Sequence, residues 1–219
     1  MKKSLLKKIT LILLFVATAL IIGLSILVHY HPVLRFDVDF SRDLQSEGDI
    51  PFVKNIVLAV LTFISFIGKT TVAIWIVLFF SFLFWVLKYY WETLFCLITP
   101  ISALVNSSIK LLINRPRPDQ NLVYILDHEI SPSYPSGHVV FFTVFFGYLI
   151  AAMFFATKIP KIIRLIIGLL SFALIILVSV SRIYLGAHWL TDVIAGYLLG
   201  IILLSILLYF YLRNYLNKR

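Results

Sequence analysis

Three short segments hold the residues of this chain whose types and spacing could do chemistry. Residues 181–192 read SRIYLGAHWLTD, which places an arginine, a histidine and an aspartate between two long apolar runs. Residues 110–118 read KLLINRPRP, and residues 135–138 read PSGH. Charged and titratable side chains are costly at the edge of a lipid hydrocarbon layer, so they usually mark a working site there.

The basic residues of these segments have the properties of a phosphate-binding site. Lys110, Arg117 and Arg182 carry fixed positive charge, and the two guanidinium groups can bind phosphate oxygens bidentately. An apolar run follows residues 135–138 at once, so Ser136 is predicted to act as the N-cap of a helix. Gly137 would let a backbone N–H approach an anion at the positive end of that helix.

The remaining polar residues could transfer the phosphate group. His188 and Asp192 are four residues apart, hence on one face of a helix. The carboxylate can accept a hydrogen bond from one imidazole nitrogen and leave the other free as a nucleophile. His138 suits the general acid that protonates a leaving oxygen. The predicted catalytic residues are therefore His188, His138 and Asp192.

Each of these residues also has a plain structural explanation. A single lysine or arginine at the end of a membrane span is usually an anchor whose charge reaches the interface. We keep that interpretation for Arg115, because the spacing from Lys110 selects Arg117. The other histidines are interpreted as packing or interfacial residues: His29, His31 and His128. A carboxylate in the first turns of a membrane helix, such as Asp192, is harder to explain without a partner.

The composition places the chain among integral membrane proteins. Of its 219 residues 61% are hydrophobic and 13% are charged, whereas a soluble domain carries roughly 25% charged residues. The net charge of +9 does not indicate nucleic-acid binding, because the basic residues form short clusters between apolar runs. The single cysteine, Cys96, lies inside an apolar run. No cysteine or acidic cluster has metal-ligand spacing, so we expect neither a metal nor a cofactor.

The apolar runs predict about six membrane-spanning helices. Seven runs are present, at roughly 9–28, 52–67, 71–87, 93–113, 138–157, 162–181 and 189–212. The first has the basic start of a signal peptide but is long enough to cross a bilayer, so we expect it to remain as an uncleaved span. The shortest, 52–67, carries Lys54 and Asn55 and could lie at the interface as an amphipathic helix.

Six crossings also give a consistent charge distribution. The basic clusters KKSLLKK, KYYWE, KIPKIIR and RNYLNKR then fall on one side, which the positive-inside bias makes the cytoplasm. The acidic segment 35–49 falls outside, as do the loop 119–134 and the ends of the helices that carry the three motifs. We therefore predict an all-α, single-domain helical bundle over residues 1–219, with a motif core at 110–192. Both termini would be cytoplasmic and the site would face outward.

The three segments together resemble the type 2 phosphatidic acid phosphatases, or lipid phosphate phosphatases, which share a site with vanadium haloperoxidases. That family's motifs are Lys-x6-Arg-Pro, Pro-Ser-Gly-His and Ser-Arg-x5-His-x3-Asp, and all three are complete here. The resemblance implies a six-span enzyme with an outward-facing site, a phosphohistidine intermediate and no metal. It also implies that His188 attacks phosphorus and that His138 protonates the leaving group.

By this resemblance the substrate would be a lipid that stays in the bilayer: phosphatidylglycerol phosphate, phosphatidic acid or undecaprenyl pyrophosphate. Two alternatives stay open at the level of sequence. A vanadate-dependent haloperoxidase would present the same cradle to vanadate, although the related oxidases are soluble. A lipid-binding or transport protein would bind headgroups without cleaving them, but it has no need of the His188–Asp192 pair. The sequence does not indicate an oligomeric state.

Overall fold

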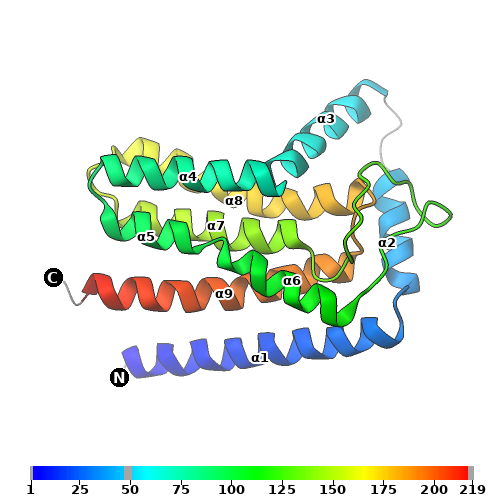
Figure 1. Ribbon diagram of the computed structural model, residues 1–219, viewed down its shortest axis with the longest axis horizontal. Helices are drawn as coiled ribbons and strands as arrows, with labels where there is room; N and C mark the ends of the chain where they lie inside the picture. The colour runs from blue at the N-terminus through cyan, green and yellow to red at the C-terminus, as the bar shows by residue number, and fades with distance from the viewer. Residues whose placement is uncertain (1, 47–50, 217–219) are drawn as a thin grey trace.

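The computed structural model describes residues 2–46 and 51–216, and within these residues all regular secondary structure is helical (Figure 1). The helices are α1 (Lys2–Tyr30), α2 (Arg35–Ser46), α3 (Pro51–Ile67), α4 (Thr70–Val86), α5 (Tyr90–Ile98), α6 (Ile101–Ile113), α7 (Gly137–Phe155), α8 (Lys161–Tyr184) and α9 (Leu190–Leu216). The all-α class predicted from the sequence is therefore confirmed.

The number of spans also agrees with the prediction. Among the described residues, five helical stretches are long and apolar enough to cross a membrane: 10–30, 90–113, 137–155, 161–184 and 190–213. Helix α4 has 17 residues and rises about 26 Å, somewhat less than a hydrocarbon layer of roughly 30 Å. It joins α3 at Gly68–Lys69 with a bend of 69°, and this bent pair supplies a sixth span if it is counted as one. The position of α3 at the interface stays a prediction.

One predicted span is broken in its middle. The run 93–113 forms two helices, α5 and α6, with the break at Thr99 and Pro100. Proline has no N–H to donate and its ring crowds the preceding turn, so it interrupts a continuous helix. Ser102 and Asn106 on α6 are nevertheless buried, which aligns this helix with the centre of the bundle.

Helix α7 forms the centre of the bundle and begins at the PSGH segment. Two thirds of its length is buried, against about a tenth of the spanning stretch of α1. Its side chains are apolar on all sides, a pattern typical of a helix surrounded by others. It packs mainly between α8 and α9. The position of α7 places its first turn, with Gly137 and His138, against the ends of both neighbours.

The connections and the ends of the chain divide between the two ends of the bundle (Figure 1). The first turns of α1, the last turns of α9 and the connections α4–α5 and α7–α8 lie at one end, at the left of the view. At the other end are α2 and the long connection 114–136. This arrangement agrees with the charge distribution expected for six crossings, because the connections that carry Lys88 and Lys158 and the start of α8 at Lys161 share one end.

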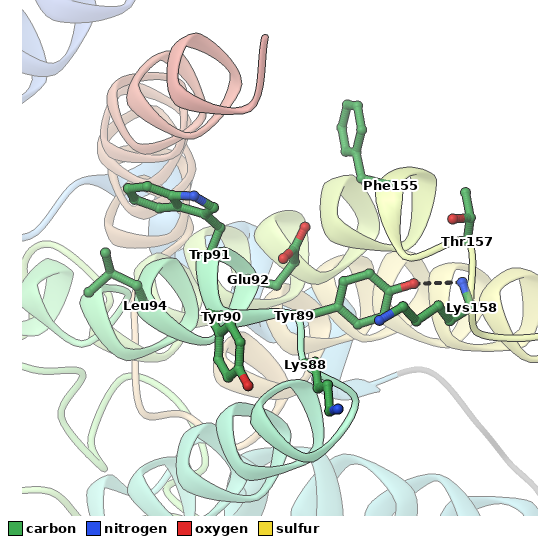
Figure 2. Close-up of a pocket in the computed structure, with 9 residues that line it drawn as sticks. All are labelled: Lys88, Tyr89, Tyr90, Trp91, Glu92, Leu94, Phe155, Thr157 and Lys158. Atoms are coloured by element: carbon green, nitrogen blue, oxygen red, sulfur yellow. Dashed lines mark hydrogen bonds between the residues drawn. The ribbon is translucent and has the colours of Figure 1, made fainter. Parts of the chain in front are cut away.

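The basic end also carries a hollow of about 510 Å³ between two connections (Figure 2). Its walls include Lys88, Tyr90, Trp91 and Lys158, and the hydroxyl of Tyr89 accepts a hydrogen bond from the backbone N–H of Lys158 at 2.5 Å. Aromatic rings and lysines of this kind are typical of a belt at a membrane–water interface. This hollow therefore belongs to the anchoring end of the molecule, remote from the three motifs.

The acidic segment 35–49, which the sequence analysis placed outside the membrane, contains a helix. Residues 35–46 form helix α2, while residues 47–50 lie outside the described residues. The buried side chains of α2 are Asp37, Val38, Ser41 and Gln45, which share one helical face. The Gln45 amide donates to the carbonyls of Tyr124 and Tyr184 at 2.8 and 2.9 Å. Helix α2 therefore fastens the connection 114–136 to the end of α8.

Candidate active site

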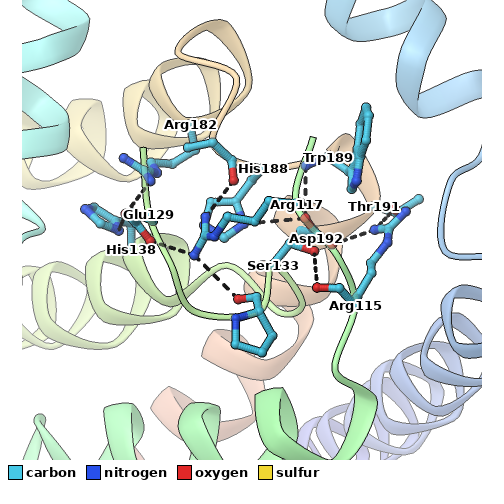
Figure 3. A network of polar contacts seen from close by, with 12 residues as sticks. Arg115, Arg117, Glu129, Ser133, His138, Arg182, His188, Trp189, Thr191 and Asp192 are labelled. Atoms are coloured by element: carbon cyan, nitrogen blue, oxygen red, sulfur yellow. Dashed lines mark hydrogen bonds and ion pairs between the residues drawn. The ribbon is translucent and has the colours of Figure 1, made fainter. Parts of the chain in front are cut away.

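The three motifs converge at the end of the bundle that carries α2 (Figure 3). Arg182 comes from the last turn of α8, His188 from the turn between α8 and α9, and Asp192 from the first turn of α9. Arg117 lies in the connection that follows α6, and His138 opens α7. The fold thus brings together side chains that are up to 75 residues apart in the sequence.

Arg117 and His188 are in direct contact. The Nη1 of Arg117 lies 3.3 Å from the Nε2 of His188 and also donates to the carbonyl of Ala187 at 2.6 Å. A guanidinium group can only donate hydrogen bonds, so this contact requires Nε2 to carry a lone pair. The proton of the neutral ring then resides on Nδ1, a tautomer assigned from its partners.

His188 is almost completely buried and faces Asp192. Its Nδ1 lies 3.4 Å from the Oδ2 of Asp192, although Nδ1 makes no hydrogen bond within the part of the chain that the structure describes. Catalytic hydrogen bonds are often long or misaligned before substrate binds. Burial, followed by the positive charges of Arg117, Arg182 and Lys110, lowers the pKa of His188 well below its ordinary 6.5. At neutral pH the imidazole is therefore uncharged, as a nitrogen nucleophile must be.

A carboxylate bridges the two arginines that the sequence assigned to phosphate. Glu129 accepts a hydrogen bond from Arg117 Nη2 on Oε2 and one from Arg182 Nη2 on Oε1, each at 2.6 Å. Arg182 is fully buried, so its charge requires such a partner. Glu129 therefore shows that an anion with two oxygens fits between the two guanidinium groups.

Asp127 is a second acidic partner of Arg182. Its Oδ2 accepts hydrogen bonds from Arg182 Nη1 at 2.8 Å and from the Ser65 hydroxyl at 2.9 Å. Burial alone would raise the pKa of Asp127, but the charge and hydrogen bonds of Arg182 and the Ser65 bond outweigh it and lower the pKa. Asp127 is therefore ionised at neutral pH, and Ser65 ties α3 to the site.

His138 lies against the break between α3 and α4. Its Nε2 is 3.1 Å from the carbonyl of Ser65, and its Nδ1 is 3.8 Å from Oε1 of Glu129. The carbonyl can only accept, so Nε2 carries a proton and Nδ1 is the nitrogen that faces the cradle. Gly68 makes room for the ring, because a Cβ at this position would lie 2.1 Å from the imidazole.

The PSGH segment occupies the predicted place but does not cap as predicted. Ser136 is the N-cap residue of α7, yet its hydroxyl makes no cap bond. The Oγ is buried and has no hydrogen-bond partner among the described residues, while the Ser136 N–H donates to the carbonyl of Asp192 at 3.0 Å. A Cβ on Gly137 would lie 3.1 Å from the Asn106 amide, so glycine permits the close packing of α7 on α6. Ser136 therefore keeps a free polar atom beside the motifs.

Lys110 lies at the end of α6 and reaches the same region. Its Nζ donates to the carbonyl of Pro132 and, at 3.4 Å, to that of Ser133. The connection 114–136 is therefore fixed by both Lys110 and Arg117, whose Nε donates to the carbonyl of Ser131 at 2.6 Å.

A cavity of about 590 Å³ leads from the motifs to the space between the helices. Its polar part includes Lys110, Gly137 and His138 together with Asp127 and Glu129. Its other part is lined mostly by apolar and small residues of α4, the α5–α6 break, α6 and α7: Ala73, Ile74, Val77, Pro100, Ala103 and Phe141. Arg117, Arg182 and His188 are not among the lining residues, whereas Glu129 lines the cavity and contacts both arginines.

Arg115 differs from its interpretation as an interfacial anchor. Its side chain is fully buried, with Nη1 2.5 Å from Oδ1 of Asp192 and Nη2 2.7 Å from Oδ2 of Asp37. An anchor would extend its charge into water, whereas this arginine lies between two buried carboxylates. The anchor interpretation of Arg115 is therefore wrong, and residues 115 and 37 belong to the surroundings of the site.

The described residues contain no group of three or more His, Cys, Asp or Glu side chains placed to hold a metal ion. The positive charges at the site come instead from the side chains of Lys110, Arg117 and Arg182. This donor set suits an anion more than a cation.

Comparison with known proteins agrees with the three motifs. The sequence profile of the PAP2 superfamily matches residues 89–216. Phosphatidylglycerophosphatase B of Bacillus subtilis is 38% identical over 104 residues, which are 46% of this chain and 48% of that protein. Undecaprenyl-diphosphatase of Sulfolobus acidocaldarius is 38% identical over 87 residues, or 39% of this chain and 37% of that protein. The matched stretches thus span half or less of these relatives.

Two solved structures share the fold. The crystal structure of a transmembrane PAP2-type phosphatidylglycerolphosphate phosphatase from Bacillus subtilis has a TM-score of 0.75 at 24% identity, covering 90% of this chain and 94% of that one. The structure of Aquifex aeolicus LpxE has a TM-score of 0.61 at 22% identity, covering 80% and 96%. Because the family profile covers more than half of the sequence, the chain belongs to the PAP2 superfamily.

Proposed function

We propose that the protein is a membrane phosphatase that removes the terminal phosphate from a lipid whose tail remains in the bilayer. The single observation that carries this proposal is the cavity, which joins a basic site to an apolar passage between α4 and α6. A lipid phosphate has a dianionic head and an apolar tail, so it matches both parts. The named relatives support the same chemistry, since one acts on phosphatidylglycerophosphate and the other on an undecaprenyl diphosphate.

Binding of the phosphate group requires a rearrangement of Glu129. In the present structure its carboxylate binds both Arg117 and Arg182 and lines the cavity, whereas His188 does not line it. A phosphate oxygen pair can replace the carboxylate because it offers the guanidinium groups the same bidentate contacts with more charge. The free Oγ of Ser136 and the ammonium of Lys110 are available for the remaining oxygens.

The proposed reaction has two steps. In the first, the Nε2 lone pair of His188 attacks phosphorus, the bond from phosphorus to the leaving oxygen breaks, and His138 gives that oxygen a proton from Nδ1. In the second, His138 takes a proton from water on Nδ1, the water oxygen bonds to phosphorus, the bond from phosphorus to Nε2 of His188 breaks with its electron pair returning to Nε2, and phosphate departs. The cations stabilise the charge that spreads over the equatorial oxygens in both transition states.

The proposal is tested by phosphate release from purified protein in detergent. Phosphatidic acid, phosphatidylglycerol phosphate and undecaprenyl pyrophosphate serve as substrates, each with and without EDTA. We expect release from at least one lipid, unchanged by EDTA because side-chain cations do the work of a metal. We also expect inhibition by vanadate, which mimics the pentacoordinate transition state. Loss of activity on EDTA that magnesium restores would contradict the site described above.

The same preparation separates the two alternative functions. A vanadate-dependent haloperoxidase would oxidise halide with peroxide and vanadate and would release no phosphate from lipids. A lipid-binding or transport protein would bind the headgroup and release nothing. The uncharged imidazole of His188 beside Asp192 favours the phosphatase, because a site that only binds a headgroup requires cations but no oriented imidazole.

We further propose that the site faces the outside of the cell and that both termini are cytoplasmic. The connections rich in lysine lie at the end opposite the motifs, and positive charge accumulates on the cytoplasmic side of membrane proteins. Single cysteines test this in intact cells, with an impermeant thiol reagent. We expect Asp39→Cys and Asn121→Cys to react and Lys161→Cys not to react, and the opposite pattern would place the site in the cytoplasm.

A further inference from the structure

We propose that Arg115 and Asp37 are positioning residues: Arg115 keeps Asp192 aimed at His188, and Asp37 keeps Arg115 in place, which makes α2 a part of the active site. This inference rests on the proposed function, because it assigns a task in phosphate transfer to residues that touch no substrate. It concerns a buried row of four side chains, from Asp37 through Arg115 and Asp192 to His188.

The orientation of Asp192 is fixed by two hydrogen bonds. Its Oδ1 accepts from Arg115 Nη1 at 2.5 Å, and its Oδ2 accepts from the backbone N–H of Trp189 at 2.9 Å (Figure 3). The second bond is that of a capping residue that reaches back to the N-cap of α9. With both oxygens held, the carboxylate has one rotamer, and in it Oδ2 lies 3.4 Å from Nδ1 of His188.

Arg115 itself is held from three directions. Besides Asp192 it donates to the carbonyl of Pro32 through Nε at 2.8 Å, and to Asp37 through Nη2 at 2.7 Å. Asp37 in turn accepts the backbone N–H and the hydroxyl of Thr191, at 2.9 and 2.7 Å. A guanidinium with three directions of donation can satisfy all these acceptors at once. The α1–α2 turn, α2 and α9 therefore meet at this one side chain.

The charges of the row have a consequence for catalysis. Asp37, Arg115 and Asp192 sum to a charge of −1, so the row favours a positive or phosphorylated imidazole at His188. Without Asp37 the row is neutral, and Asp192 stabilises the imidazolium less. Without Arg115 the carboxylates of Asp37 and Asp192 lie together with no positive charge between them, and their repulsion raises the pKa of one of the two. If Asp37 and Arg115 served stability alone, their charges would not affect the protonation of His188.

The test compares four variants with the wild type in purified, detergent-solubilised protein. Arg115→Met is expected to lower kcat about 10- to 100-fold, by analogy with the loss of an outer hydrogen-bond partner that orients a ligand at a metal site. KM should change little, because Arg115 does not line the cavity. Arg115→Lys keeps the charge and should restore most of kcat. Asp39→Asn is the matched control on α2: Asp39 pairs with Arg35 on the surface and with no other charged side chain among the described residues, so this change should leave kcat unchanged.

The decisive measurement is the acidic limb of kcat/KM, which reports the ionisation of the free enzyme. Asp37→Asn should move this limb to lower pH and Arg115→Met should move it to higher pH, each by about 0.5 to 1 unit, since a directly adjacent charge shifts a pKa by about 1–3 units. Arg115→Lys and Asp39→Asn should leave it in place. The other charged or titratable groups that face His188 are unchanged in all four variants: Asp192, Lys110, Arg117, Arg182 and His138.

A nitrogen-15 NMR titration of the His188 ring provides the same comparison without turnover. A purely structural role would lower the melting temperature of the variants and leave the titration of His188 where it is, and that result would overturn the proposal. If Arg115→Met does not fold, the same test compares the pH at which His188 titrates in Asp37→Asn with that in Arg115→Lys: the first should be lower, and the second should equal the wild type. A wild type that releases no lipid phosphate would instead contradict the proposed function, while the ring titration would still test the row.

Discussion

Replacing His188 by alanine should abolish turnover while the protein remains folded and inserted in the membrane. The attacking nitrogen is then missing, and no other imidazole of the described chain lies against Arg117 as Nε2 of His188 does. We expect kcat to fall roughly 10⁴- to 10⁶-fold, the range measured for loss of a nucleophile or its partner in serine proteases. The binding of vanadate should weaken far less, because the guanidinium groups of Arg117 and Arg182 remain.

Rapid quenching with radiolabelled lipid phosphate tests the same residue more directly. Wild-type protein should trap a label that is labile in acid and stable in base, as expected of a phosphohistidine, and His188→Ala should trap none. His31→Ala is a suitable control, because His31 is exposed and remote in sequence from the motifs. Label that persists in His188→Ala would assign the nucleophile to another residue.

The residues of this candidate site were predictable because placing charged side chains in or near the hydrocarbon layer costs much free energy. Arg182, His188 and Asp192 lie at the ends of apolar runs, where charge persists only with a function or a partner. Helical spacing then placed His188 beside Asp192, and the structure has them 3.4 Å apart. The spacing from Lys110 to Arg117 was equally informative, since Arg117 contacts His188 directly.

The partners of these residues were not predictable, because each depends on a contact distant in sequence. Asp127 and Glu129 lie in a connection without helical or strand periodicity, so no pattern indicates that they face Arg182. Arg115 resembles any other arginine at the end of a span. Its burial depends on contacts with Asp37 and Asp192, each more than seventy residues away in the sequence. The five acidic residues at 35–49 placed this segment outside the membrane, but they did not indicate that Asp37 lies on the buried face of a helix.

The fold was predictable where hydropathy alone decides, and less so where backbone breaks do. Long apolar runs identify α1, α7, α8 and α9 because a bilayer accepts few other structures. The breaks at Gly68 and Pro100 line the cavity that leads to the site, and a hydropathy profile indicates neither of them. Gly186 is a further example, since its φ of +68° permits the turn that aims His188 at the cradle.

His138 is the residue whose replacement should distinguish between substrates. Its Nε2 proton is donated to the carbonyl of Ser65, so a protonated His138 can give up only the proton on Nδ1, the nitrogen that faces Glu129. A phosphate group in the place of Glu129 would put its leaving oxygen within reach of that proton. The benefit of this proton depends on how basic the leaving oxygen is.

The two lipid classes differ greatly in that respect. A phosphate monoester on a glycerol lipid expels an alkoxide, whose conjugate acid is an alcohol nearly as weakly acidic as water. A polyprenyl pyrophosphate expels a phosphate group, whose second pKa is roughly 6. General acid catalysis typically contributes about 10²- to 10⁴-fold, and the alkoxide should require the upper end of that range.

His138→Ala should therefore reduce hydrolysis of phosphatidic acid far more than hydrolysis of undecaprenyl pyrophosphate, when kcat is measured for both lipids with one preparation. His128→Ala is the matched control, because His128 lines the same cavity and should affect the two lipids alike. Equal losses in His138→Ala would mean that His138 positions the phosphate and does not protonate the leaving group. The ratio of the two losses depends on the leaving oxygen and not on how well each lipid tail fits between α4 and α6, so it tests the role of His138 alone. The preferred lipid is identified separately, as the one that the wild type hydrolyses faster.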